Sequence, residues 1–222
     1  MIKTILSSNQ KKFLDLFVNF DDLRKNFYLT GGTCLSEFYL KHRYSEDLDF
    51  FSEKEVDFLL INTFIKKSKK KLEYQKIDFQ KSFNRNIYQL IFDKKNFLKV
   101  EFTYFPFDAV DKRIEKAGLI IDSLKDIAVN KIFTIIQNPR GRDYFDLYFI
   151  IKKMNLDILE LLKLARIKFD YQIDYLNVGS QLIRFSDFKD DPILVDKMSN
   201  FEKIEVFFNN LAKNLKKRIL KF

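Results

Sequence analysis

The sequence predicts an α+β protein in which a strand-rich first half is followed by a helical second half. Residues 27–51 read as strand, Gly-Gly turn, helix and strand, and residues 73–105 contain three further β-prone segments. From Ser123 onward, apolar residues recur every three or four positions, which is the spacing of amphipathic helices. We therefore expect an α/β core over residues 1–122 and a helical region over residues 123–222.

The first elements are predicted from apolar periodicity and from a glycine pair. Residues 8–26 have the apolar stripe of a helix, and the apolar segment 27–30 reads as a strand. The following Gly31 and Gly32 allow a tight turn and let a ligand approach the backbone closely. Helical spacing resumes after the glycines, and a second strand is expected to begin near Asp47.

The remaining elements follow from the same two patterns. A helix over residues 54–71 ends in a run of lysines, which either compensates the negative end of the helix dipole or forms a patch that binds nucleic acid. Strands are expected at 74–81, 87–92, 98–105 and 119–121, and helices from 123 to the turn at 138–141, then near 142–153, 157–168, 172–186 and 201–221.

The charge of the chain favours an anionic partner. Its 222 residues include 40 basic and 31 acidic side chains, which gives a net charge of +9. Such an excess favours nucleic acid first and a membrane surface second. A lysine-rich genome would produce the same excess without any partner, so the composition leaves both interpretations open.

The cysteine and histidine content excludes several classes of site. Cys34 is the only cysteine in the sequence and His42 the only histidine, so neither an internal disulfide nor a Cys/His zinc site can form. A lone cysteine fits a reducing cytosol. Because no apolar run approaches 18 residues and no signal-peptide pattern opens the chain, we expect a cytoplasmic protein that does not span a membrane.

A pair of carboxylates follows the glycine turn and predicts a metal and phosphate site. Asp47 and Asp49 are two positions apart on a predicted strand, so their side chains face the same side. Two adjacent carboxylates repel each other unless a cation joins them. A hard ion such as Mg²⁺, shared with the phosphates of a nucleotide, would do so. Backbone N–H groups at the start of the helix after Gly32 can hold phosphate oxygens.

Several other charged residues interrupt their local pattern. Lys131 lies within an apolar helical stripe, where it is either a phosphate-binding lysine or a lysine that snorkels at the edge of the stripe. Asp143 opens the next helix and either takes part in catalysis or caps that helix. Glu101 lies on the polar side of an apolar strand, and Arg43 either contacts phosphates or balances the acidic cluster.

Two runs of residues resemble motifs of one family. Residues 31–51, which contain Gly-Gly-Thr and then His-Arg-Tyr-Ser-Glu-Asp-Leu-Asp-Phe-Phe, resemble the first motif of AbiEii-type nucleotidyltransferases. That family includes toxins of type IV toxin–antitoxin and abortive-infection systems. Lys131, followed by Arg-Gly-Arg-Asp at residues 140–143, resembles the family's lysine motif and its Arg-x-basic-Asp motif. The resemblance covers about residues 27–150.

The resemblance implies the polymerase-β-like nucleotidyltransferase fold, which is a small mixed β-sheet flanked by helices and followed by a helical C-terminal region. It also implies a role for each matching position. Nucleotide binding falls to Gly31, Gly32, Thr33 and Lys131, with Arg43 beside them; metal binding falls to Asp47 and Asp49, with Glu101 as a third carboxylate; and catalysis falls to Asp47, Asp49, Lys131 and Asp143.

The function that follows is transfer of a nucleoside monophosphate from an NTP to an RNA end or a protein hydroxyl, with Mg²⁺ or Mn²⁺ as cofactor. The family implies a toxin, with an antitoxin protein and RNA or another nucleic acid as partners. One alternative is a catalytically silent module that binds nucleotide or nucleic acid on the same fold. Another is a metal-dependent nuclease or phosphohydrolase that uses the same carboxylates.

Overall fold

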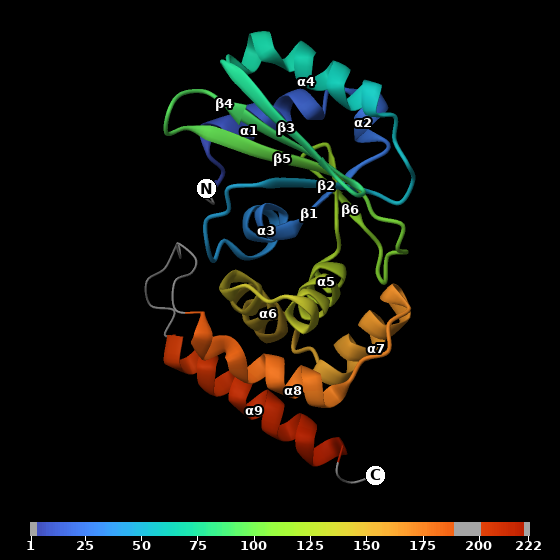
Figure 1. The fold of residues 1–222 in the computed structure, drawn as a ribbon, viewed down its shortest axis with the longest axis vertical. Helices are drawn as coiled ribbons and strands as arrows, with labels where there is room; N and C mark the ends of the chain where they lie inside the picture. The colour runs from blue at the N-terminus through green and yellow to red at the C-terminus, as the bar shows by residue number, and fades with distance from the viewer. Residues whose placement is uncertain (1–3, 189–200, 220–222) are drawn as a thin grey trace. The chain divides into compact units, whose positions relative to one another are not determined.

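The computed structural model describes residues 4–188 and 201–219, which belong to two compact units (Figure 1). The first unit comprises Met1–Asp108 and Lys112–Ser123, and the second comprises Ala109–Asp111 and Leu124–Phe222. Strands occur in the first unit, and every element that the structure describes from Leu124 onward is helical, so the α+β class predicted from the sequence is confirmed.

Within the described residues, seven strands of the first unit form one mixed sheet with the order β3-β4-β5-β2-β1-β7-β6. β2 runs antiparallel to β1 and parallel to β5, and β1 runs parallel to β7. The remaining pairs are antiparallel. The strands are β1 Tyr28–Thr30, β2 Leu48–Ser52, β3 Lys76–Ser82, β4 Arg85–Ile91, β5 Phe97–Tyr104, β6 Ile114–Lys116 and β7 Leu119–Ile121.

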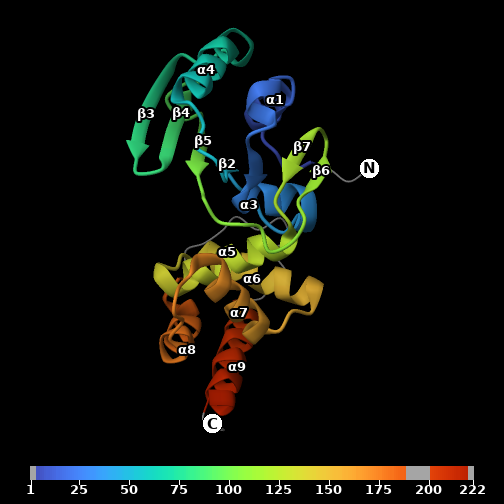
Figure 2. The same ribbon diagram turned by 90° about the vertical axis from the view of Figure 1, so that its right-hand side faces the viewer.

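One face of this sheet is apolar and carries the core of the first unit. Phe50 of β2 and Phe102 of β5 stack with ring centroids 5.2 Å apart. Phe17 of helix α1 (Ser8–Phe17) stacks on Phe50 at 4.2 Å, and Phe64 of helix α4 (Phe58–Leu72) packs edge-on against Phe17. Figures 1 and 2 show α1 and α4 on this side of the sheet. Because strand side chains alternate, Asp49 of β2 and the polar residues Lys99, Glu101 and Thr103 of β5 occupy the opposite face.

The glycine turn connects β1 to a short helix of unusual geometry. Helix α3 (Gly31–Cys34) continues directly into a π-helical segment, η1 (Leu35–Leu40), which ends at Lys41 with a left-handed φ of 56°. The predicted order of strand, glycine turn, helix and strand is confirmed. The π-helical hydrogen bonding of the second part was not predicted, and such segments often occur at functional sites.

The second unit is helical in all its described elements. Its helices are α5 Leu124–Gln137, α6 Gly141–Met154, α7 Ile158–Phe169, α8 Tyr175–Ile183, the 3-10 helix η2 Arg184–Asp187 and α9 Phe201–Ile219. Tyr144, Phe185 and Phe208 from three of these elements pack edge-on or tilted at the centre, with centroids 5.2 to 5.8 Å apart. The predicted helical C-terminal region is confirmed.

Some predicted boundaries differ, and helix caps explain part of the difference. The helix expected over 54–71 begins at Phe58 because the Asp57 side chain accepts from the backbone N–H of Leu59. The helix expected over 8–26 is divided into α1 and a short α2 (Asp21–Arg24). β6 was not predicted. Residues 220 and 221 of the last predicted helix lie outside the described part of the chain.

Candidate active site

The glycine turn lies against the first carboxylate strand. Thr30 and Asp49 are register partners of β1 and β2, so Gly31 follows beside Asp49. Gly31 has a φ of +73°, and a Cβ atom there would overlap the Asp49 carboxylate. A Cβ atom on Gly32 would overlap the Arg43 guanidinium. Gly31 is therefore required by its positive φ and by the Asp49 carboxylate, whereas a Cβ atom on Gly32 would force the Arg43 guanidinium to shift.

Two other residues expected to bind the nucleotide are buried around this turn. The Thr33 hydroxyl donates a hydrogen bond to the backbone carbonyl of Asp47 at 2.5 Å, which fixes the start of β2. Arg43 is 3% exposed, and its Nη1 donates to the carbonyl of Tyr44 at 2.9 Å. These contacts give Thr33 and Arg43 a role in shaping the turn.

The three predicted metal-binding carboxylates belong to one face of the sheet. Asp49 and Glu101 are register partners on the parallel strands β2 and β5. Asp47 precedes Asp49 by two residues and lies near β5, because its Oδ2 accepts from Nζ of Lys99 at 3.1 Å. Lys99 Nζ also lies 3.9 Å from Oε2 of Glu101. Along this face, the Lys99 ammonium therefore lies between the carboxylates of Asp47 and Glu101.

Glu101 is held by a second basic side chain from the neighbouring strand. Nε and Nη2 of Arg85, on β4, donate to the two carboxylate oxygens of Glu101 at 2.6 and 2.8 Å. The Thr103 hydroxyl donates to Oε1 at 3.0 Å. Burial alone would raise the pKa of Glu101, but Arg85, Thr103 and Lys99 outweigh burial and lower the pKa. Glu101 is therefore ionised at neutral pH.

The chemistry of these donors fits a hard divalent cation, because aspartate and glutamate oxygens are the ligands that Mg²⁺ and Mn²⁺ favour. Over residues 4–188 and 201–219, no three His, Cys, Asp or Glu side chains are grouped closely enough to hold a metal ion. Asp47 and Glu101 instead contact Lys99 and Arg85. The donor types fit the ion, and cations of the chain engage both Asp47 and Glu101.

Lys131 and Asp143 form a separate charged group inside the helical unit. Lys131 Nζ on α5 lies 2.8 Å from Oδ1 of Asp143 and 2.7 Å from Oδ2 of Asp146, both on α6. Both carboxylates are fully buried and the lysine side chain is 10% exposed. Lys131 thus stays within the apolar stripe by pairing with two acids. Arg140 supports the group, with its Nε donating to Oδ2 of Asp143 at 2.9 Å.

Asp143 also closes the first turn of α6. Its Oδ2 accepts from the backbone N–H of Arg140 at 3.3 Å. Asp143 therefore caps the helix, as one of the two interpretations of the sequence predicted, and also pairs with Lys131. Burial alone would raise the pKa of Asp143, but the positive charges of Lys131 and Arg140 outweigh burial and lower it. Asp143 is therefore a buried anion at neutral pH.

The predicted site residues consequently fall into two groups. The glycine pair, Thr33, Arg43 and the carboxylates belong to the first unit, whereas Lys131 and Asp143 belong to the second. Sequence reasoning missed Lys99 and Arg85. The alternation of Lys99 with Glu101 along one strand could have indicated the former, but Arg85 reaches Glu101 only through the register of β4 with β5.

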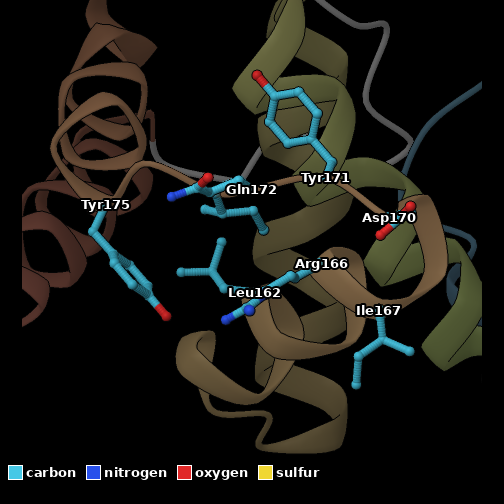
Figure 3. A pocket seen from close by; sticks show the side chains of 8 residues that line it. Leu162, Arg166, Ile167, Asp170, Tyr171, Gln172 and Tyr175 are labelled. Atoms are coloured by element: carbon cyan, nitrogen blue, oxygen red, sulfur yellow. The ribbon is translucent and has the colours of Figure 1, made fainter.

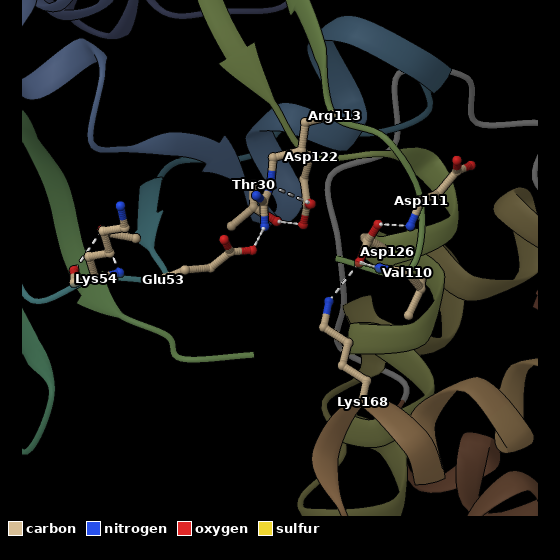
Figure 4. A network of polar contacts seen from close by, with 10 residues as sticks. Thr30, Glu53, Lys54, Val110, Asp111, Arg113, Asp122, Asp126 and Lys168 are labelled. Atoms are coloured by element: carbon tan, nitrogen blue, oxygen red, sulfur yellow. Dashed lines mark hydrogen bonds and ion pairs between the residues drawn. The ribbon is translucent and has the colours of Figure 1, made fainter. Parts of the chain in front are cut away.

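A polar network supports the end of β1 (Figure 4). The Thr30 hydroxyl donates to Oδ2 of Asp122 at 2.8 Å. Nη2 of Arg113 donates to Oε1 of Glu53 at 2.7 Å, and its guanidinium lies 3.6 Å above the ring of Tyr28. Nε of Arg113 also lies 3.6 Å from Oδ1 of Asp122, so Asp122 holds Thr30, the residue before the glycine pair, and is itself paired with Arg113.

A second network in Figure 4 lies within the helical unit. Asp126 of α5 accepts from the backbone N–H groups of Val110 and Asp111 at 2.9 and 3.0 Å, and from Nζ of Lys168 at 2.7 Å. Asp126 and Lys168 are almost completely buried. This carboxylate therefore attaches the short segment 109–111 to the helices.

A hollow of about 880 Å³ opens between α7 and α8 (Figure 3). Figure 3 shows Tyr175 on the left and Tyr171 at the top, with the Arg166 side chain below Tyr171 and extending toward Tyr175. Its lining consists of Leu162, Arg166, Ile167, Asp170, Tyr171, Gln172, Ile173 and Tyr175. The lining includes none of the site residues predicted from the sequence, as far as the described residues show.

The family follows from a match along almost the whole chain. The profile of the AbiEii family, described as the nucleotidyl transferase AbiEii toxin of type IV toxin–antitoxin systems, matches residues 13–217. The chain belongs to the AbiEii family. As an AbiEii protein it is an enzyme of the nucleotidyltransferase class, as the sequence motifs predicted.

Relatives of this AbiEii protein cover nearly its full length. An uncharacterised protein of Aquifex aeolicus is 32% identical over 213 residues, which is 94% of this chain and 96% of the relative. The crystal structure of JHP933 from Helicobacter pylori matches with a TM-score of 0.59 at 21% identity, over 97% of this chain and 95% of that one.

A second H. pylori structure, described as a candidate nucleotidyltransferase, matches with a TM-score of 0.58 at 20% identity over 97% and 98% of the two chains. These likenesses confirm the polymerase-β-like nucleotidyltransferase fold. In the described part of this AbiEii protein, no helix is both long and apolar enough to cross a membrane.

Proposed function

We propose that this chain uses Mg²⁺ or Mn²⁺ to transfer a nucleoside monophosphate from an NTP to the hydroxyl of an RNA end or of a protein. The net charge of +9 favours RNA as the acceptor, because basic surfaces attract the phosphate backbone. We further propose that the transfer makes the protein a toxin that acts in the cytoplasm and is neutralised by an antitoxin protein.

One observation carries the proposal: the Asp49 carboxylate lies directly against the Gly31 turn. A phosphate held by the backbone N–H groups after the glycines would thus be adjacent to a carboxylate that can hold the metal. The combination suits a metal-bound triphosphate better than a phosphate alone, because the anionic Asp49 would otherwise repel the ligand.

The residues of the first unit would bind the metal and the triphosphate. Asp47 and Asp49 would bind the metal, with Glu101 as the third donor, and Gly31 and Gly32 would admit the triphosphate to the backbone. When bound, the metal supplies Lewis-acid stabilisation of charge on the transferred phosphoryl group. Ionised Glu101 would keep Arg85 on the same face, where its guanidinium can meet phosphate.

The helical unit would contribute Lys131 and Asp143. A lysine ammonium has three donors, and Asp143 and Asp146 occupy two of them. The third would contact a nucleotide phosphate. Asp143, the family's later catalytic acid by resemblance, would keep that ammonium charged and correctly aimed.

Incubation with each labelled NTP, Mg²⁺ or Mn²⁺, and either total RNA or protein lysate tests the proposal directly. We expect the wild type to label an acceptor and Asp49→Asn to label none. Asp78→Asn is a matched control, because Asp78 is an exposed carboxylate on β3 of the same sheet and pairs with Lys76. The proposal fails if no NTP gives transfer, or if Asp49→Asn transfers as well as the control.

The toxin role has its own test. Induced expression of the wild type should arrest growth, and Asp49→Asn should not. Co-expression of the protein encoded by the adjacent reading frame should relieve the arrest if that protein is the antitoxin. Growth arrest that persists in the Asp49→Asn strain would mean that toxicity does not depend on nucleotidyl transfer.

The engagement of Asp47 and Glu101 by Lys99 and Arg85 favours one alternative, a binding module without turnover. Such a protein would bind RNA with a steep salt dependence, and Asp49→Asn would leave that binding unchanged. Any metal-dependent transfer by the wild type excludes this alternative.

A further inference from the structure

Lys99 is a basic residue that lies within reach of two carboxylates of the sheet, Asp47 and Glu101. It lies on β5 two residues before Glu101, so both side chains face the same side. Its Nζ is 3.1 Å from Oδ2 of Asp47 and 3.9 Å from Oε2 of Glu101. The ammonium therefore lies between two of the three carboxylates assigned to the metal.

The two carboxylates differ in how firmly they hold this lysine. Glu101 already accepts a bidentate contact from Arg85 and a hydrogen bond from the hydroxyl of Thr103, and its contact with Lys99 is the longer one. The shorter contact of Lys99 is the one to Asp47, whose side chain is 25% exposed, and the Lys99 side chain is itself 33% exposed. A partly exposed ion pair of this kind is weak and can exchange partners.

A metal ion at Asp47 and Glu101 would compete with the Lys99 ammonium for the same oxygens. Mg²⁺ requires carboxylate oxygens at about 2.0–2.1 Å, whereas an ammonium sits at about 2.8–3.1 Å. Two cations cannot share that position. By linkage, whatever stabilises the Lys99 contact weakens metal binding by the same factor.

We propose that Lys99 is a further residue of the metal and nucleotide site, an inference that rests on the proposed function. Its ammonium holds Asp47, yields that carboxylate to the entering metal, and then contacts a phosphate of the nucleotide that the metal carries. The long lysine side chain permits the movement without any change in the backbone of β5. Lys99 thereby neutralises the carboxylates first and the triphosphate afterwards.

Binding of Mn²⁺ alone, followed by electron paramagnetic resonance of the free ion, tests the first step. Lys99→Gln should bind Mn²⁺ about fivefold more tightly than the wild type, the equivalent of ~1 kcal/mol. Lys76→Gln is the matched control, because it removes the same charge from a lysine that pairs with Asp78 on β3. Its affinity should stay within about twofold of the wild type, since exposed charges at a distance are largely screened.

Salt separates direct competition from a general effect of charge. The difference between Lys99→Gln and the wild type should persist at about 0.5 M KCl, where exposed charges beyond contact distance are screened. Unchanged or weaker Mn²⁺ binding by Lys99→Gln overturns the inference, and so does a gain shared by Lys76→Gln.

Binding of an α,β-methylene NTP in the presence of saturating Mn²⁺ tests the second step. Lys99→Gln should lose about tenfold in nucleotide affinity although it binds the metal more tightly, and this opposite pair of effects is the signature of a lysine that changes partner. An unchanged nucleotide affinity overturns the second step. If the wild type transfers nucleotide but these affinities do not move, the inference fails and the proposed function stands. If Asp49→Asn transfers normally, the proposed function itself fails.

Discussion

Replacement of Lys131 by methionine would expose the energetic role of the buried charge group in the helical unit. The change leaves Asp143 and Asp146 fully buried without their common ammonium. Removing one partner of a buried ion pair costs about 3–5 kcal/mol. Arg140 still contacts Asp143, although its side chain is 53% exposed and the support is therefore weak. We expect a loss of ~3 kcal/mol, which for a chain of this size lowers the midpoint of thermal unfolding by about 6–12 °C.

The assay is urea unfolding followed by circular dichroism, with two further variants of the full chain. Lys163→Met removes an exposed lysine of α7 and should change the free energy of unfolding by less than about 0.5 kcal/mol. The triple variant Lys131→Met, Asp143→Asn and Asp146→Asn should recover at least half of the loss, because no uncompensated anion remains buried.

Two results would refute this reasoning. A loss of less than about 1 kcal/mol in Lys131→Met would mean that the two carboxylates are stabilised without the lysine. A triple variant less stable than Lys131→Met would mean that the cost arises from packing and not from unpaired charge. Loss of transfer at full stability would instead identify Lys131 purely as a nucleotide contact.

Four other outcomes follow from the structure. Gly31→Ala should abolish transfer and destabilise the chain by roughly 1–3 kcal/mol, because a Cβ atom there meets Asp49 at a positive φ. Gly179→Ala, within α8 and with open space around it, should instead stabilise it by about 0.5–1 kcal/mol in the same urea titration. Acid should weaken the fold, because the pKa of Asp143 is lower in the folded chain and the unfolded chain therefore takes up a proton first as the pH falls. The stability that ionised Asp143 confers should be complete above about pH 5 and should decrease below about pH 4. The buried Cys34 thiol, whose pKa is raised by burial, should react with Ellman's reagent only as the protein unfolds, whereas fast reaction in the native protein would contradict that burial.

Much of the fold was predictable because its signals are local. The alternation of apolar and polar residues on β5 gave the strand and placed Glu101 on its polar face. Glycines at 31 and 32 gave the turn, and helical periodicity gave the second unit. These patterns depend on neighbours within a few positions of the chain, which a sequence displays directly.

The partners of the charged side chains were not predictable because they depend on strand register and helix packing. Arg85 reaches Glu101 across 16 positions of the sequence, and Lys131 reaches Asp143 across 12. The apolar stripe showed that Lys131 needed an anion, and the sequence left a phosphate and a surface position as the options. The structure supplies a third, a pair of carboxylates on the adjacent helix.

Because β5 has one apolar and one polar face, mutations at successive positions of this strand should have different effects in the cell. Leu98, Val100 and Phe102 are at most 2% exposed, so replacing them by polar residues should reduce how much folded protein a cell accumulates. Lys99→Gln, at a partly exposed side chain, and Glu101→Gln, which keeps the size of the buried side chain, should leave abundance nearer to normal and mainly alter what the protein does to its host. In a selection for survivors of a toxic gene, escape mutants along this strand would therefore alternate, position by position, between missing protein and intact but harmless protein.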